Sequence, residues 1–444
     1  MISARSLWKK VRPIVVVLLI LFVCIQFVRP RLDNPPVTGD FKAPADVKAV
    51  IQRACYDCHS NETHLAWFDL PAPAYWLVAD HVKKGRMVLN FSNWDSLPKG
   101  QQLGKLYESL NQIEYNVMPL SQYTAFHHGG RVSPEEVALL RQYLLSLTPR
   151  AMPDTVKQRA SAEQYEKWIL EAVGSRGPVA DEYDGVGYAD LAGFRNWTAV
   201  STTERFDNGT MRLILGNAVV ERAIREGHTN PWPKGAVFAK VAWDQLPDSA
   251  GEIRTGAFKQ VEFMIRDGQK YSTTGGWGWA RWVGGLGLKP YGHDPSFTME
   301  CINCHKPMAS NDQTFTIPLA DTLELAATDT LRLAGADTLR PMMGKVITTL
   351  AHPGEGTMST LYGNDAAVKD ARAGKPYSTG AVVTLVTWEQ RDDPHWFGGR
   401  IPAAVRTVEV VKYTGAGAAY SGNENASGQA RISYIAGLKA AVLP

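Results

Sequence analysis

Two five-residue motifs, CYDCH at 55–59 and CINCH at 301–305, carry the most reactive residue types in this sequence. The pattern C-x-x-C-H is the attachment signal for c-type haem, because two thiols can reach the two vinyl groups of one porphyrin and the adjacent histidine can bind its iron. A single copy can also arise by chance, bind zinc or act in redox exchange. Two copies that both end in histidine predict two covalently attached c-type haems, held by Cys55, Cys58 and His59 and by Cys301, Cys304 and His305.

The side chain on the far face of each iron decides its chemistry. Methionine or histidine closes the site for electron transfer, whereas an open position admits ligands. For the first haem we predict Met118, in the Met-Pro pair of NVMPLSQY; the alternative is that Met118 only fills the core. Five other side chains remain candidates: Met87, His64, His81, His127 and His128.

The second haem has no comparable partner in the sequence. Met308 follows His305 by three residues, which is too close for its side chain to reach the other face of the porphyrin. We therefore expect an open or water-bound iron at this site.

The chain has 444 residues, enough for about two to four domains. A net charge of +3 gives no indication of a nucleic-acid partner. Lys9, Lys10 and Arg12 precede an apolar run from Pro13 to Val28 that lacks a small-residue cleavage site. This predicts an uncleaved N-terminal membrane helix, with a cleaved secretion signal as the alternative. Because c-type haem is attached outside the cytoplasm, we expect the rest of the chain on the periplasmic side of the inner membrane.

The chain also contains an internal duplication. Residues 209–217, 235–245, 261–268 and 280–290 match 356–364, 380–390, 408–415 and 430–440, in the same order and at similar spacing. Short apolar or alternating runs between Gly, Pro and Asn predict strands. NAVVERAIREG and NDAAVKDARAG predict one helix in each copy. Each copy is therefore predicted to be an antiparallel sheet with a helix.

The two copies differ where chemistry is expected. Copy one carries C-x-x-C-H and copy two does not. Lys240, in the strand GAVFAKVAW, corresponds to Leu385 in GAVVTLVTW, whereas Glu262 corresponds to Glu409. From spacing alone, Lys240 either faces the haem or lies on the wet face of an edge strand. Glu262 is either a site carboxylate or a solvated one.

The predicted fold class is α+β with several domains: an N-terminal membrane helix, a mostly α-helical cytochrome c-like domain and two antiparallel β-sheet domains, the second without haem. The predicted boundaries are an anchor and tether at 1–40, a c-type haem domain at 41–150, a linker with a helix at 151–188, a sheet domain with haem at 189–319, a repeat-like linker at 320–341 and a haem-free sheet domain at 342–444.

Residues 41–150 resemble a family of single-haem, haem-binding domains. The stretches that carry the resemblance are CYDCHSNET, WFDLPAPAYWL, DHVKKGRMVLNFSNW and MPLSQYTAFH. The resemblance implies a mostly helical cytochrome-like domain and supports Met118 as the second axial ligand. It implies no reaction.

Residues 189–319 resemble the cytochrome P-460 family, which includes the open-site c′-beta cytochromes. The stretches that carry the resemblance are FRNWTAV, PKGAVFAKVAW, VEFMIRDGQKY, GGWGWARW, CINCHK and NDQTFT. The family fold is an antiparallel sheet domain, often dimeric, with one c-type haem. In P-460 members a strand lysine, here Lys240, is bonded to the porphyrin, and a distal carboxylate, here Glu262, assists proton transfer. The residue after Lys240 is Val241, at a position where the family resemblance would suggest a carboxylate, so the match to the family is imperfect there.

This resemblance implies a membrane-anchored dihaem oxidoreductase that acts on hydroxylamine or a related small nitrogen oxide and passes electrons through the first haem to an external redox cytochrome. The alternatives are a nitric-oxide binding or scavenging cytochrome and a plain electron-transfer protein. Because family members pair through their sheets, the two copies are also expected to form a pseudo-dimer within the chain.

Overall fold

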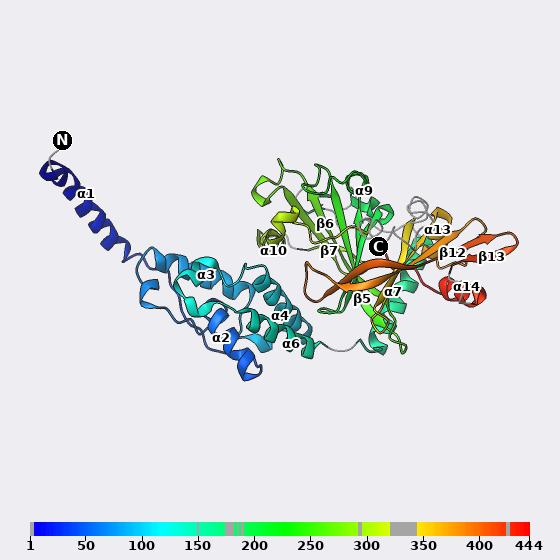
Figure 1. Cartoon of the computed structure of the whole chain (residues 1–444), viewed down its shortest axis with the longest axis horizontal. Coiled ribbons are helices and arrows are strands. Elements are labelled where there is room, and N and C mark those ends of the chain that lie inside the picture. The colour runs from blue at the N-terminus through cyan, green and yellow to red at the C-terminus, as the bar shows by residue number, and fades with distance from the viewer. Residues whose placement is uncertain are drawn as a thin grey trace. The chain divides into compact units, whose positions relative to one another are not determined.

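The computed structural model describes residues 4–148, 151–173, 182–183, 186–187, 191–291, 295–319, 344–422 and 427–444. The chain divides into two compact units, Met1–Thr148 and Pro149–Pro444, and each is described by itself (Figure 1). The predicted linker at 320–341 lies outside the described residues.

The first unit is helical, as predicted. Its elements are α1 (Ala4–Ile25), α2 (Ala45–His59), η1 (Trp67–Asp69), α3 (Ala74–Val88), η2 (Trp94–Ser96), α4 (Lys99–Glu114), α5 (Ser121–Phe126), η3 (His128–Gly130) and α6 (Pro134–Leu147). Helix α6 begins with a capping box: Ser133 Oγ accepts from the Glu136 N–H at 3.3 Å, and Glu136 Oε2 accepts from the Ser133 N–H at 2.9 Å. This capping fixes the start of the last helix in the unit.

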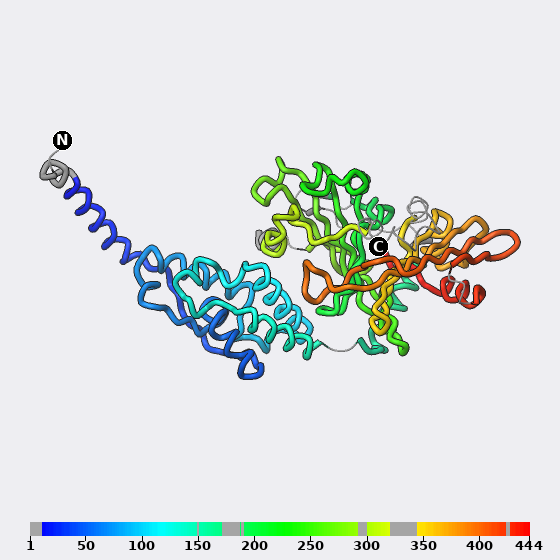
Figure 2. The backbone as a smooth tube through the Cα atoms, in the orientation of Figure 1, coloured from blue at the N-terminus to red at the C-terminus, as the bar shows by residue number. Residues whose placement is uncertain are grey.

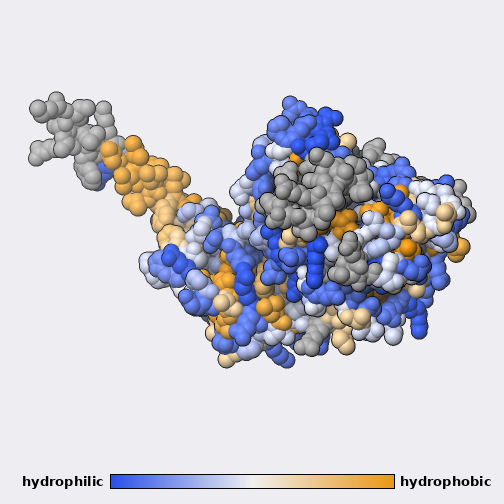
Figure 3. Space-filling model, turned by 45° about the vertical axis from the view of Figure 1, so that its right-hand side comes forward, coloured by the Kyte–Doolittle hydropathy of each residue, from blue (hydrophilic) through white to orange (hydrophobic). Residues whose placement is uncertain are grey.

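The predicted membrane helix is not borne out. The apolar side chains of α1 from Ile14 to Val23 are exposed and colour this helix orange in Figure 3. The same helix contains Lys9, Lys10 and Arg12, which shorten its uncharged part. Among the residues described, no helix combines the length and the apolar character needed to cross a bilayer.

The second unit contains both copies of the duplicated segment, which Figure 2 shows in green and in yellow to red. It begins with α7 (Thr155–Val173) and the short β1 (Glu182–Tyr183) and β2 (Val186–Gly187). Copy one comprises η4 (Ala192–Asn196), β3 (Thr198–Arg205), β4 (Thr210–Gly216), α9 (Ala218–Arg225), β5 (Val237–Pro247), β6 (Ile253–Arg266), η5 (Ser272–Thr274), β7 (Trp277–Val283), β8 (Lys289–Pro290), α10 (Pro295–His305) and η6 (Lys306–Asn311). Copy two comprises β9 (Lys345–His352), β10 (Thr357–Gly363), α13 (Asp365–Arg372), β11 (Val382–Asp392), β12 (Gly399–Thr414), β13 (Gly417–Ser421) and α14 (Gly428–Ala436).

Three of the four matched segments have the same structure in both copies. The two predicted helices, α9 and α13, are confirmed, and each is capped by an asparagine side chain, Asn217 and Asn364. The fourth match was wrong as a structural equivalence, because 280–290 lies in β7 and β8 whereas 430–440 begins in α14. In copy two the hairpin strand β13 follows β12 at once and pairs with it, so the matched residues do not form that strand.

Strands of the two copies join one hydrogen-bonded sheet. Among the described strands the path runs β5-β4-β3-β12-β11-β10-β9-β6 and closes on itself, because β6 also pairs with β5. The joints are reciprocal: β12 pairs with β3 through Gly399 and Arg205, and β6 pairs with β9 through Ile253 and Ala351. One core cluster contains buried residues from both copies, among them Trp243 and Trp388. The two copies therefore fold as one body.

Candidate functional site

The first haem motif forms the end of helix α2. Cys55, Cys58 and His59 lie in its last turns at spacings that place them on one side of the helix. The Nδ1 atom of His59 lies 3.1 Å from the Gly85 carbonyl oxygen and 3.2 Å from that of Leu89. Nδ1–H therefore donates to the backbone, which leaves Nε2 to bind iron. Burial lowers the pKa of His59 and favours the neutral ring that metals bind.

Helix α3 packs directly against this motif. A Cβ atom on Gly85 would lie 2.5 Å from the Cys58 carbonyl oxygen, so the approach of the two helices requires glycine. The next residue, Arg86, donates from Nε to the Ser60 carbonyl at 2.7 Å. Helix α3 thus holds both the end of α2 and the ring of His59.

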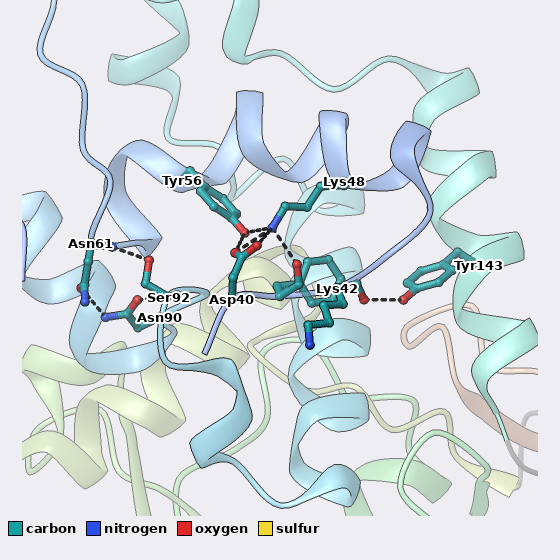
Figure 4. Close-up of polar contacts among 9 residues, drawn as sticks. Asp40, Lys42, Lys48, Tyr56, Asn61, Asn90, Ser92 and Tyr143 are labelled. Atoms are coloured by element: carbon teal, nitrogen blue, oxygen red, sulfur yellow. Dashed lines mark hydrogen bonds and ion pairs between the residues drawn. The ribbon is translucent and has the colours of Figure 1, made fainter. Parts of the chain in front are cut away.

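A polar network holds α2 from its other side (Figure 4). Lys48 Nζ donates to Asp40 at 2.7 Å, and the Tyr56 hydroxyl donates to the same carboxylate at 2.7 Å. Directly after the motif, the Asn61 N–H donates to Ser92 Oγ at 2.9 Å. Burial, together with its bond to Asp40, raises the pKa of Tyr56 and keeps the phenol a donor. These contacts fix the helix that carries the two cysteines.

Met118 lies half-buried between α4 and α5, where its N–H donates to the Gln112 carbonyl at 3.1 Å. Three of its rivals, Met87, His64 and His128, are exposed.

His127 is already engaged at both ring nitrogens, with Nε2 at 3.0 Å from Asp69 Oδ2 and Nδ1 at 3.2 Å from the Tyr123 carbonyl. His81 is half-buried on α3, the helix whose Gly85 carbonyl contacts His59 Nδ1. Met118 stays the predicted second axial ligand.

The second motif forms the end of helix α10. His305 Nδ1 lies 2.8 Å from the Gln313 carbonyl oxygen, which again leaves Nε2 for iron. The ring of His305 contacts two aromatic rings: its centroid is 6.0 Å from that of Trp279 and 5.1 Å from that of Phe315, whose plane is at 75° to it. Burial lowers the pKa of His305 to about 4 and keeps the ring neutral.

The turn after α10 brings the Gln313 carbonyl to this ring. Asp312 and Gln313 have left-handed backbone angles, with φ of 45° and 61°, and the Gln313 N–H donates to the Met308 carbonyl at 2.8 Å. The Asp312 carboxylate accepts from the Trp232 N–H at 2.8 Å and anchors the turn to the segment between α9 and β5. Met308 itself is buried within this turn.

A row of three charged side chains crosses the neighbouring sheet. Lys240 on β5 is directly opposite Glu262 on β6, which is directly opposite Arg281 on β7, so all three share one face. Lys240 Nζ contacts Glu262 Oε2, and Arg281 Nε lies 2.6 Å from Glu262 Oε1. The sequence identified Lys240 and Glu262 but missed Arg281, although the ARW and ARI of the two copies could have pointed to it.

The charge of Lys240 acts on the second haem motif. Burial lowers the pKa of Lys240 well below its usual value, with Arg212 and Arg281 adding to the effect and Cys304 opposing it. The Lys240 charge in turn contributes to the low pKa of His305. Arg281 of the same row lies with Nη1 3.4 Å from Oε1 of Glu300, the residue before Cys301, so the row lies on the side of the sheet that carries the haem motif. Lys240 is half-buried, and an amine with a lowered pKa is a better nucleophile than an ammonium.

Arg212 on β4 lies on the same face as Lys240, because it is two residues from Ile214, which is directly opposite Lys240. Its Nε donates to Thr210 Oγ1 at 3.3 Å. The side chain is half-buried, and desolvation lowers its pKa to about 9 while the charge of Asp207 opposes this shift. A partly desolvated guanidinium on this face can accommodate an anionic group.

Copy two preserves part of this row and lacks the rest. Leu385 is directly opposite Glu409, as Lys240 is opposite Glu262. Glu409 is 4% exposed and accepts from Arg431 Nε at 2.6 Å and from the Tyr420 hydroxyl at 2.7 Å. The carboxylate–arginine pair is thus common to both copies, and the lysine belongs only to the copy with the haem motif.

Comparisons with known families agree with these two sites. Residues 20–146 match the model of the haem-binding domain, and residues 191–316 match the model of cytochrome P460. No protein of curated function matches the chain. The matched segments include both C-x-x-C-H motifs, with Met118 in the first and the Lys240–Glu262–Arg281 row in the second.

Proposed function

We propose that this chain, a haem-binding domain followed by a cytochrome P460 domain, is a dihaem c-type oxidoreductase that acts on hydroxylamine or a related small nitrogen oxide. The observation that carries the proposal is the row Lys240–Glu262–Arg281, which lies beside the second haem motif because Arg281 Nη1 is 3.4 Å from Oε1 of Glu300, the residue before Cys301. Its lysine is replaced by Leu385 in the copy without that motif.

The residues at both sites fit c-type haem. Each motif offers two cysteines on one side of a helix and a histidine whose Nδ1 is held by a backbone carbonyl. Arg212 would hold a propionate of the second haem, because it is a partly desolvated cation on the face that carries Lys240 and Glu262. When bound, the haems supply the iron at which the substrate reacts and carry electrons to an external redox cytochrome.

The chain's own side chains would handle protons. Glu262 is the proposed proton acceptor, since oxidation of an N–H or O–H substrate releases protons. Arg281 holds one carboxylate oxygen and so orients Glu262. Lys240 contacts the other oxygen and, with its lowered pKa, is the proposed point of attachment to the porphyrin edge.

A second function is a nitric-oxide binding cytochrome. The contact between Lys240 and Glu262 favours it, because an amine paired with a carboxylate is restrained from attacking the porphyrin. This function requires haem attachment through Cys301 and Cys304 alone.

We also propose that both haem-bearing parts lie on the periplasmic side of the inner membrane, because c-type haem is attached outside the cytoplasm.

Adding hydroxylamine to the oxidised, purified protein without oxygen tests the proposal. We expect the absorbance bands of reduced c-type haem to appear in proportion to the hydroxylamine added. Mass measurement of the digested haem peptide distinguishes the two functions, since a link through Lys240 supports oxidation. Absence of reduction, together with binding of nitric oxide, would replace the enzyme with the binding protein.

A further inference from the structure

The hairpin between β11 and β12 of the haem-free copy contacts the haem segment of copy one. His395 Nδ1 lies 2.7 Å from the carbonyl oxygen of Phe315, two residues after the Gln313 that holds the haem ligand. The rings of Trp396 and Phe315 meet edge to face, with centroids 5.8 Å apart and planes at 77°. Two neighbouring residues of the hairpin thus hold the backbone and the ring of Phe315.

Phe315 in turn contacts the haem ligand His305. Its ring meets that of His305 edge to face, with centroids 5.1 Å apart and planes at 75°. The order of contacts is therefore Trp396, Phe315, His305, and the first of these belongs to the copy that lacks haem.

The hairpin is firmly attached to copy one. Trp396 Nε1 donates to Asp207 Oδ2 at 3.1 Å, and the Arg205 guanidinium lies 4.5 Å from the centroid of the Trp396 ring. The Asp207 N–H also donates to the Gly398 carbonyl at 3.2 Å, next to the joint between β12 and β3. These contacts leave Trp396 little freedom to move away from Phe315.

The opposite hairpin makes a corresponding contact that involves no haem ligand. Between β5 and β6, Glu252 of copy one accepts from the Tyr434 hydroxyl of α14 at 2.7 Å. Each copy therefore extends one hairpin to the other copy, but only the contact between Trp396 and Phe315 continues to a haem ligand, His305. The contact between Glu252 and Tyr434 offers a matched control.

We infer that the haem-free copy serves the second haem as a positioning partner. Its residues Trp396 and His395 fix Phe315, and Phe315 sets the orientation of the His305 ring. Side chains around an axial ligand tune the bound metal by orienting that ligand. The inference requires that His305 holds a haem, as the proposed function does, but it requires no particular substrate.

The test compares full-length Trp396→Ala with Trp396→Phe and Tyr434→Phe. We expect Trp396→Ala to keep both haems attached, to shift the reduction potential of the second haem and its ferric electron paramagnetic resonance signal, and to speed amide hydrogen exchange in peptides covering 311–319. Trp396→Phe retains a ring against Phe315 and should restore much of the wild-type signal. Tyr434→Phe breaks the contact at the haem-free site and should leave the second haem unchanged.

The inference is overturned if Trp396→Ala has the same reduction potential, electron paramagnetic resonance signal and amide hydrogen exchange as the wild-type protein. Equal shifts in Trp396→Ala and Tyr434→Phe would overturn it as well, because the effect would then be general destabilisation. If Trp396→Ala does not retain haem, His395→Ala, which removes the bond to the Phe315 carbonyl and keeps the Trp396 ring, is measured in the same way. If hydroxylamine does not reduce the wild-type protein, the proposed function is refuted. The comparison of the Trp396 and Tyr434 variants still decides whether the haem-free copy positions His305.

Discussion

At position 240 on β5 copy one carries an amine, and at position 385 on β11, the equivalent strand, copy two carries a buried hydrocarbon side chain. Both side chains face a glutamate that is paired with an arginine. The carboxylate and the arginine are therefore explained by the fold of either copy, whereas the lysine is explained only by the haem site.

Lys240→Leu gives copy one the side chain of copy two. We expect the strand to persist, because Arg281 still pairs with Glu262. If Lys240 is bonded to the porphyrin, the digested wild-type haem peptide carries a third link that the variant lacks, and the reduced absorbance band of the variant moves to the position of ordinary c-type haem. Identical masses and spectra for the two proteins would exclude the bond.

Glu262→Gln removes the carboxylate between Lys240 and Arg281. We expect hydroxylamine-dependent haem reduction to slow by about 100-fold, as for loss of a general base. Glu409→Gln is the matched control, because it removes a buried carboxylate from Arg431 at the haem-free site. The control should cost about 3–5 kcal/mol in the free energy of unfolding and leave the rate per folded molecule unchanged. Equal rates for the two variants would contradict a role for Glu262 in proton transfer.

Among the elements, α2 and α3 form the first site through one close approach. Gly85→Ala would place a methyl group 2.5 Å from the Cys58 carbonyl, so we expect α3 to shift, the bonds to His59 Nδ1 to break and the haem content to fall. Haem content per protein and the melting temperature measure the effect.

Gly104→Ala is the control for this change. Gly104 is also inside a helix, α4, but a Cβ atom there meets nothing within 4 Å. This variant should be stabilised by about 0.5–1 kcal/mol, the usual gain in a helix. Full haem content in Gly85→Ala would show that the approach of α3 is not needed for the site.

The elements also show what the sequence could and could not predict. The attachment motifs, the two equivalent helices and the capping box of α6 depend on local patterns, and the structure contains them. The pairing of Arg281 with Glu262 depends on cross-strand register, which the sequence of one strand does not contain. Residues 280–290 form strands whereas 430–440 begin in a helix, because β13 already pairs with β12 in copy two. This pairing is a property of the whole sheet.

At the scale of the whole second unit, the two copies share a sheet and a core that neither could complete alone. The sequence predicted that the copies would pair, but not that β6 and β12 would each extend into the sheet of the other copy. Contacts between each hairpin and the other copy likewise join residues far apart in the sequence: His395 and Phe315 are 80 positions apart, and Trp396 and Asp207 are 189 apart.

Deleting 342–444 tests this dependence. The deletion would remove buried partners of Trp243, whose Nε1 donates to the Val442 carbonyl at 2.8 Å, and would leave β3 and β6 with unpaired edges. We expect self-association or loss of folding, measured by size-exclusion chromatography and thermal unfolding. A soluble monomer that unfolds at the wild-type temperature would contradict the shared core.

The most direct test of the central claim, one closed and one open haem, is the absorbance of the reduced protein before and after carbon monoxide. The account predicts that the haem of His59 and Met118 keeps its bands while the haem of His305 shifts. A spectrum that carbon monoxide leaves wholly unchanged would contradict it.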